Sequence, residues 1–221
     1  NPERGKRATN PALAQRLIGK GLTLEPDVAI GWFNLGIGLH QQRKISAAIK
    51  AYQHCLALPH TADTSIAARN NLSQDLLLQG EWKQGWNLYN KRFRRIPGNY
   101  PIFANAIGTA HTSMPGPERP VLLMSEQGLG DTLQFVRYAL AMQKKGIDVT
   151  LLSQTPLVEF LHDAAGLRQV SDHLDLVEQK KRNPIWLPLM NLGPLMGCVN
   201  EKVPFPDGYV QASANSIAKW R

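Results

Sequence analysis

A recurrence of small and aromatic residues every 34 positions constrains the first half of this chain more than any other feature. Ala14 and Ile18 are followed 34 residues later by Ala48 and Tyr52. A period of this length is typical of helix-turn-helix repeats, in which each helix pair buries its apolar side against the next pair. The recurrence therefore predicts an all-α solenoid (a stack of repeated helix pairs) at the start of the chain.

The second copy of the pattern shows the packing positions most clearly. Gly36 on its first helix lets the paired helix approach closely, and Ala48 fills the matching small position on the second helix. A third copy follows 37 residues further on, so about three residues are inserted around His60–Asp63. We expect one opening helix and two full helix pairs. The side chains expected to be buried between them are Trp32, Leu35, Leu39, Tyr52, Leu72 and Tyr89.

These residues resemble the tetratricopeptide repeat, and the resemblance covers residues 1–95. It implies that the helices bind a protein or peptide partner. Two positions depart from the family pattern, because Ser73 replaces the glycine of the third copy and Cys55 replaces the alanine of the second. The first copy also begins halfway through a repeat. Since a terminal repeat would expose its apolar face without a cap, we expect the chain to be a fragment of a longer protein.

Composition changes after Arg95. Residues 96–118 contain four prolines and three glycines without helical periodicity, which is typical of a connector. Its apolar residues Tyr100, Ile102 and Phe103 predict that it lies along a folded surface, because a free linker would be more polar. We therefore expect the two halves of the chain to form one rigid body.

The formal net charge of +8 is unevenly distributed. Residues 1–95 carry 14 Lys and Arg against 6 Asp and Glu, whereas residues 96–221 carry 11 of each. The densest basic run, Lys91–Arg95, could contact phosphate, but cations are already favourable at the carboxyl end of a helix. No zinc-finger, RNP or basic-zipper pattern accompanies it, so we expect no nucleic-acid partner.

From residue 119 onward the pattern alternates between strand and helix. The apolar run at the start predicts a strand buried on both faces, and the later strands are joined by helical patterns. Strands so connected imply a parallel sheet, so residues 119–221 are predicted to form an α/β Rossmann-like domain. The strands are expected at 121–125, 149–153, 167–170 and 185–187, and the helices at 132–145, 155–165 and 213–220.

The loop between the first strand and its helix is the candidate site. The order strand, glycine turn, helix places Glu126–Asp131 at the edge where strand carboxyl ends meet helix amino ends, and backbone N–H groups there favour anions. We expect Gly128 and Gly130 to turn the backbone sharply and let a ligand approach, and Asp131 to cap the helix. A capped helix without a ligand would account for the same motif.

Established nucleotide and hydrolase motifs do not match this loop. The dinucleotide fingerprint needs a third glycine where this chain has Leu133, and Asp148 starts the second strand although a ribose ligand should come from its end. No Gly-Lys-Ser/Thr follows, which excludes a P-loop, and Ser125 lacks a GxSxG elbow. Cys55 and Cys198 lie far apart without a Cys/His cluster, so neither a disulfide framework nor a metal site is expected.

The run from Ser125 to Tyr138, Ser-Glu-Gln-Gly-Leu-Gly-Asp-Thr-Leu-Gln-Phe-Val-Arg-Tyr, resembles the Gly-Asp loop of heptosyltransferase-like glycosyltransferases. It is closer still to bacterial proteins that join tetratricopeptide repeats to such a domain. The stretches Gly80–Arg92 and Pro206–Val210 are similar to other motifs of those proteins. The resemblance implies one half of a GT-B fold, in which the amino-terminal domain binds the acceptor and the carboxyl-terminal domain binds the nucleotide sugar donor.

The same resemblance implies roles for the loop residues. Asp131 matches the family aspartate proposed as the base that deprotonates the acceptor hydroxyl, and a helix amino end keeps a carboxylate ionised near neutral pH. The residues implied in acceptor binding are Glu126, Gln127, Gly128 and Gly130, with Gln134 and Arg137 further along the helix. No cofactor is expected in this chain, and a nucleotide sugar donor is expected for the full-length protein. Since no second domain follows Arg221, we expect the chain alone to be inactive.

Two functions remain open at this stage. The first is the acceptor half of a glycosyltransferase, which would act on a glycan or a protein, joined to a repeat module. The second is a non-catalytic scaffold whose repeats bind a protein or peptide. A longer reading frame with a second phosphate-binding α/β domain would favour the enzyme, and a natural stop after Arg221 would favour the scaffold. No apolar run approaches the roughly 20 residues of a spanning helix, and the opening residues lack a signal peptide, so a cytoplasmic location is expected.

Overall fold

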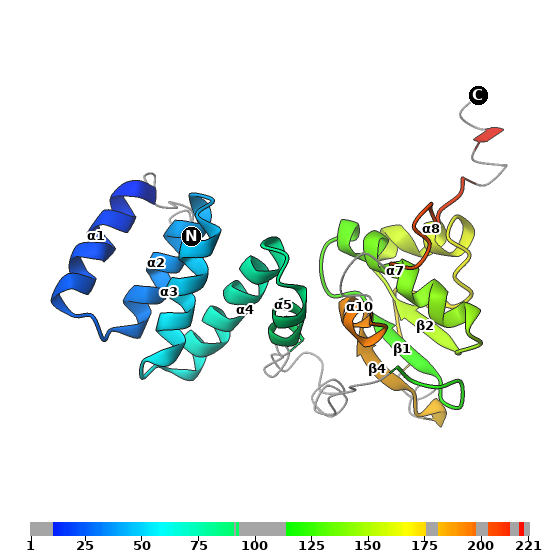
Figure 1. The fold of residues 1–221 in the computed structure, drawn as a ribbon. Helices are drawn as coiled ribbons and strands as arrows, with labels where there is room; N and C mark the ends of the chain where they lie inside the picture. The colour runs from blue at the N-terminus through cyan, green and yellow to red at the C-terminus, as the bar shows by residue number, and fades with distance from the viewer. Residues whose placement is uncertain are drawn as a thin grey trace. The chain divides into compact units, whose positions relative to one another are not determined.

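The computed structural model of the chain describes residues 11–90, 92, 114–175, 181–197, 203–212 and 217–218. The chain divides into two compact units, Asn1–Phe93 and Arg94–Arg221. The first unit is helical and the second contains a parallel sheet (Figure 1). The apolar connector residues Tyr100, Ile102 and Phe103 lie outside the described residues, so their packing stays a prediction.

The described part of the first unit consists of α-helices that each pack against the next (Figure 1). They are α1 (Pro11–Leu24), α2 (Ala29–Gln41), α3 (Ile45–Ala57), α4 (Ala62–Leu78) and α5 (Trp82–Tyr89). The residues inserted in the third copy do not lengthen a loop, because α4 has 17 residues where α2 has 13. They form an extra first turn of α4, whose N-cap Thr61 accepts a hydrogen bond from the Thr64 backbone N–H at 3.2 Å.

The contact between α2 and α3 depends on a glycine. A Cβ atom at Gly36 would lie 2.4 Å from the Tyr52 ring, and that ring is 1% exposed. The predicted burial is confirmed for Leu39, Tyr52, Leu72 and Tyr89. It is wrong for Trp32 and Leu35, which pack on the same cluster but stay partly exposed.

Trp32 stays partly exposed because the N–H edge of its indole ring forms a hydrogen bond at the surface of the helical unit. Its indole N–H donates to the Pro26 carbonyl at 2.7 Å, and its ring lies against His54 with centroids 4.1 Å apart. A buried indole needs a hydrogen-bond partner, and here the chain turn before α2 supplies one. The residue therefore joins the turn to the helices while its ring packs at the edge of the core.

Two polar residues on α4, Ser73 and Asp75, are completely buried. Ser73, which occupies the position of a repeat glycine, donates its hydroxyl to the Asn70 carbonyl on its own helix at 2.7 Å. Asp75 is fully buried, and its Oδ1 lies 2.6 Å from Nδ1 of His40 on α2. Burial raises the pKa of Asp75, and the hydrogen bond and charge of His40 oppose that rise.

The second unit is built on a sheet of parallel strands in the order β3-β2-β1-β4. The strands are β1 (Val121–Met124), β2 (Val149–Leu152), β3 (Val170–Ser171) and β4 (Ile185–Pro188). In the centre of the sheet Leu123 pairs with Leu151 on one side and with Leu187 on the other. All residues of β1 are buried, as its continuous apolar sequence predicts. The expectation of a helical region followed by a parallel α/β unit is confirmed.

Among the elements whose bounds the structure describes, helices follow β1, β2 and β4. They are α7 (Leu129–Lys144) after β1, the 3₁₀ turn η2 (Thr155–Leu157) leading into α8 (Val158–Asp163) after β2, and η3 (Leu189–Asn191) leading into α10 (Leu192–Leu195) after β4. The strand predicted at 167–170 begins only at Val170, the first residue of β3. Leu167 still belongs to the turn after α8, because its backbone N–H donates to the Leu161 carbonyl. The helix predicted at 213–220 falls outside the described residues except at 217–218. None of the helices that the structure describes combines the length and apolar character needed to cross a membrane.

Candidate functional site

The sheet order places the loop after β1 at a position that favours ligands. The connection from β1 runs to β2 on one side, while β4 pairs with β1 on the other side. In open parallel sheets, ligands bind outside the strand carboxyl ends where the connections diverge in this way. Residues 125–128 follow β1 directly at that edge, and α7 begins at Leu129.

Asp131 lies in the first turn of α7 and does not occupy the N-cap position, so the position predicted for the cap is wrong. The N-cap is Gly128, whose backbone N–H donates to Asp131 Oδ2 at 3.1 Å. The helix begins three residues earlier than predicted because Leu129 and Gly130 already take helical conformation. Asp131 still satisfies a backbone donor at the helix start, and its Oδ1 makes no hydrogen bond to a described residue.

The two loop glycines do not make the sharp turn predicted for them. Gly128 has φ −66° and ψ 169°, and Gly130 is absent from the glycines with positive φ. A Cβ atom at Gly130 would meet nothing within 4 Å, and one at Gly128 would touch only the Asp131 carboxylate, at 3.5 Å. Neither backbone strain nor packing requires glycine here. The missing side chains instead leave the backbone of this turn open to close approach.

A side chain from the end of β2 holds this loop. Gln154 donates its Nε2 hydrogen to the Gln127 carbonyl at 2.7 Å, and its Oε1 accepts from the Thr132 hydroxyl at 3.0 Å. Ser125 at the start of the loop donates its hydroxyl to the Leu152 carbonyl at 3.0 Å. Sequence reasoning missed Gln154. The one available signal was that a polar residue directly follows the second predicted strand, at the edge where the loop lies.

The predicted site residues are only partly brought together. Glu126, Gln127, Gly128, Gly130 and Asp131 share the loop and the first turn of α7; Glu126 and Asp131 are half-buried and the others are exposed. Gln134 is exposed on the next turn of the helix.

Arg137 lies further along α7 and has a different neighbour. Its guanidinium lies 4.6 Å from the centroid of the Tyr209 ring, and the Tyr209 hydroxyl donates to the Leu133 carbonyl. Arg137 therefore helps to hold residues 203–212 against α7. Its place in acceptor binding stays a prediction.

A further polar pair follows β3 at the same edge of the sheet. Asp172 lies 2.9 Å from Nδ1 of the exposed His173. Hydrogen bonds from His173 and Thr155 stabilise the carboxylate, so the pKa of Asp172 is lowered. Within the described ranges, no group of three or more His, Cys, Asp or Glu side chains is placed to hold a metal ion.

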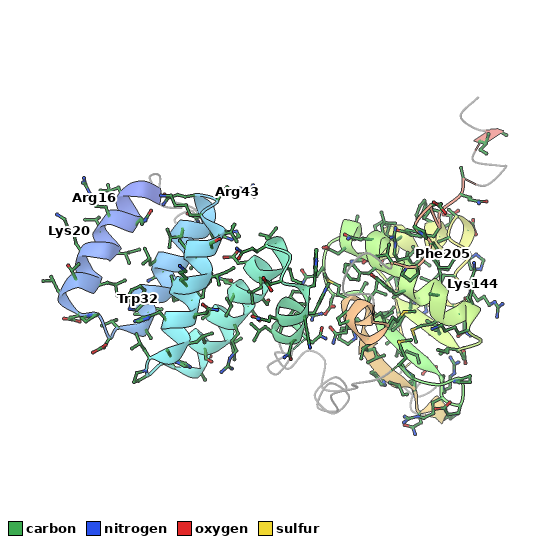
Figure 2. The ribbon with its side chains drawn as sticks, in the orientation of Figure 1. Arg16, Lys20, Trp32, Arg43, Lys144 and Phe205 are labelled. Carbon is green, nitrogen blue, oxygen red and sulfur yellow. The ribbon has the colours of Figure 1, made fainter. Side chains whose placement is uncertain are left out.

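The second unit also contains a hollow of about 540 Å³ near the carboxyl end of α7. Its lining includes Lys144, Asp163 and Phe205, and the Lys144 ammonium lies 4.3 Å from the centroid of the Phe205 ring (Figure 2). The Gly128–Asp131 turn lies at the other end of the same helix. The hollow is therefore separate from the candidate site.

The fold and the site define a class of protein: a helical unit followed by a parallel α/β unit, with an uncovered glycine turn where the central strand ends. Comparison of the chain with protein-family models, with curated proteins and with solved structures finds no match. The function proposed below rests on the geometry of the site and on the resemblance of its loop.

Proposed function

We propose that this chain is the acceptor-binding part of a GT-B glycosyltransferase joined to tetratricopeptide repeats. The observation that carries the proposal is the uncovered turn at the carboxyl end of β1. Neither packing nor backbone conformation requires its two residues, Gly128 and Gly130, to be glycine in the described structure. A glycine that neither packing nor backbone conformation requires is explained if a ligand occupies the space that a side chain would fill. The resemblance of residues 125–138 to the Gly-Asp loop supplies the ligand, an acceptor with a nucleophilic hydroxyl.

Asp131 is the general base in this proposal. Its Oδ2 is held by the Gly128 N–H, and its Oδ1 makes no hydrogen bond to a described residue, so that oxygen can take the hydroxyl proton. The hydroxyl oxygen then forms a bond to the anomeric carbon of a nucleotide sugar, and the nucleoside diphosphate leaves with the electron pair of the broken carbon–oxygen bond. General base catalysis of this kind contributes roughly 10²- to 10⁴-fold.

The helical unit supports a role in binding a protein or peptide. Its helices pack in sequence, and α3 approaches Gly36 closely through the Tyr52 ring, in agreement with the close approach that the resemblance implies for this glycine. The first helix presents exposed apolar side chains, with Leu17 58% and Leu24 84% exposed. The side chains of Arg16 and Lys20 on the same helix point away from α2 (Figure 2).

The test is glycosyl transfer by the full gene product, measured by mass spectrometry with a panel of nucleotide sugars and of glycan and peptide acceptors. Asp131→Asn should fold normally and lower kcat by roughly 10²- to 10⁴-fold. Gly130→Ala should raise KM for the acceptor, because a methyl group enters the proposed ligand space. The matched control is Gly19→Ala, another glycine without positive φ whose Cβ would meet nothing within 4 Å.

One observation favours the rival, a non-catalytic scaffold. The hydrogen bond from Gly128 to Asp131 is what the start of any helix needs, so a purely architectural role accounts for it. If wild-type protein transfers no sugar from any donor and Gly130→Ala and Asp131→Asn both bind the repeat partner normally, the scaffold is correct. Full transfer activity in both variants would also reject the proposed site.

A further inference from the structure

We propose that Gln154 is the positioning residue of this site: its side-chain amide sets the conformation of the turn from Gln127 to Asp131. The importance of that turn rests on the proposed function. The positioning itself follows from the contacts of Gln154 and can be tested without a ligand.

Both ends of the Gln154 amide are engaged. The Gln127 carbonyl can only accept a hydrogen bond, so the atom facing it at 2.7 Å must be the amide nitrogen. The amide oxygen then faces the Thr132 hydroxyl at 3.0 Å, and Thr132 is 1% exposed. Gln127 precedes the N-cap Gly128 and Thr132 follows it. A single side chain therefore holds both sides of the glycine turn.

The turn has few restraints of its own. A Cβ atom at Gly130 would meet nothing within 4 Å, and one at Gly128 would meet only the Asp131 carboxylate at an ordinary van der Waals distance. Glycine also has the widest backbone freedom of any residue. The hydrogen bond between Gly128 and Asp131 stays within the turn and does not tie it to the sheet. Ser125 ties the start of the loop to β2 through the Leu152 carbonyl. The turn itself is tied to a neighbouring element by Gln154.

Gln154 is itself fixed to the sheet. It lies two residues after the end of β2, and the preceding Ser153 donates its backbone N–H to the Ser171 carbonyl at 2.8 Å. It is also the N-cap residue of η2. The amide thus connects the turn after β1 to the end of β2, across 27 residues of sequence.

The chemistry requires one donor and one acceptor on the same side chain. A glutamate at this position can still accept from Thr132, but it can donate to the Gln127 carbonyl only when it is protonated. Gln154→Glu therefore makes the restraint dependent on pH, since free glutamate titrates near pH ~4.3 and a facing carbonyl oxygen raises that value. Gln154→Ala removes the restraint at every pH.

The experiment is amide hydrogen exchange of the peptide covering 125–132, compared with wild type at each pH from about 4.5 to 7.5. In Gln154→Ala, exchange should be faster by about tenfold throughout, the effect of losing about one hydrogen bond. In Gln154→Glu, the same acceleration should appear at the high end and disappear as pH falls. The recovery is a signature that a merely space-filling role would not produce.

Gln143 offers a matched control, because both ends of its amide are also engaged. It donates to the Gly166 carbonyl at 3.0 Å and accepts from the Arg168 N–H at 2.9 Å. Gln143→Glu should change exchange near 166–168 and leave 125–132 unchanged. Wild-type exchange of the loop in Gln154→Ala, or no recovery at low pH in Gln154→Glu, would overturn the proposal. If exchange responds as expected but the wild-type gene product transfers no sugar, the positioning role stands and the proposed function fails.

Discussion

Two glycines show how differently the two units use the same residue. In the helical unit, packing requires glycine at position 36, because a Cβ atom there would lie 2.4 Å from the Tyr52 ring. In the α/β unit, packing does not require glycine at position 130, because a Cβ atom there would meet nothing within 4 Å. The first glycine is explained by packing between helices. The second is explained if a ligand approaches the backbone at that point.

The largest expected effect concerns the ring that Gly36 accommodates. Tyr52→Ala should lower the free energy of unfolding of the helical unit by about 3 to 5 kcal/mol, because it removes a fully buried aromatic side chain. Urea denaturation followed by circular dichroism measures the loss. Leu17→Ala, at a side chain that is 58% exposed, is the control and should change stability far less. An unchanged midpoint for Tyr52→Ala would break the packing argument.

Smaller effects of opposite sign are expected at the two glycines. Gly36→Ala should destabilise by about 1 to 3 kcal/mol through overpacking against Tyr52. Gly130→Ala should stabilise by up to about 1 kcal/mol, because alanine is the better helix former where space is open. In the Tyr52→Ala background, Gly36→Ala should cost much less, and a double-mutant cycle measures that coupling. Equal costs at Gly36 with and without the ring would contradict the contact.

Asp131→Asn should have a small effect on stability, about 0.3 to 1 kcal/mol, because it removes a negative charge from the first turn of α7. Thermal unfolding at low ionic strength measures this change, which should shrink in high salt. A loss of several kcal/mol would show that the carboxylate has a larger structural role than holding the Gly128 N–H.

The buried carboxylate of Asp75 provides a contrast in its pH dependence. Burial raises the pKa of Asp75 above its usual value of 3.8, so the folded chain holds this proton more tightly than the unfolded chain does. The stability that the proton contributes is therefore lost as pH rises through the raised pKa. Asp75→Asn should remove this part of the decline. Thermal midpoints of the variant and the wild type, measured from about pH 3.5 upward, would contradict this if their difference did not vary with pH.

Much of the helical unit was predictable because its signals are local and repeated. The 34-residue spacing predicted that the paired helix approaches Gly36 closely, although it matched Gly36 with Ala48 and the structure places the Tyr52 ring there. Leu39, Leu72 and Tyr89 were expected in the core where they are found. What failed was the insertion near Thr61, which extends α4 by a turn. An inserted segment is predicted to be a loop when only the repeat pattern is considered, and its own N-cap and helix-forming residues must be considered as well.

The candidate site was predictable only in part. The position of the Gly128–Asp131 turn followed from the order of strand, glycine and helix. The backbone of that turn did not follow, because glycine permits both the sharp turn that was expected and the ordinary helix start that is found. The contribution of Gln154 was also missed, since its hydrogen bonds join residues 22 and 27 positions away.

The sequence by itself determined most of the elements and their order, because helical periodicity, buried strands and turn residues act over a few neighbouring positions. It also determined that a glycine turn follows the first strand. It did not predict the helix at Leu192–Leu195. Only the tertiary structure decided which strand lies beside β1 on each side, which glycine has a packing partner and which has open space, and which side chain reaches the turn from β2. These outcomes depend on distances between residues far apart in the chain, which hydrogen bonding and packing set only after the sheet has formed.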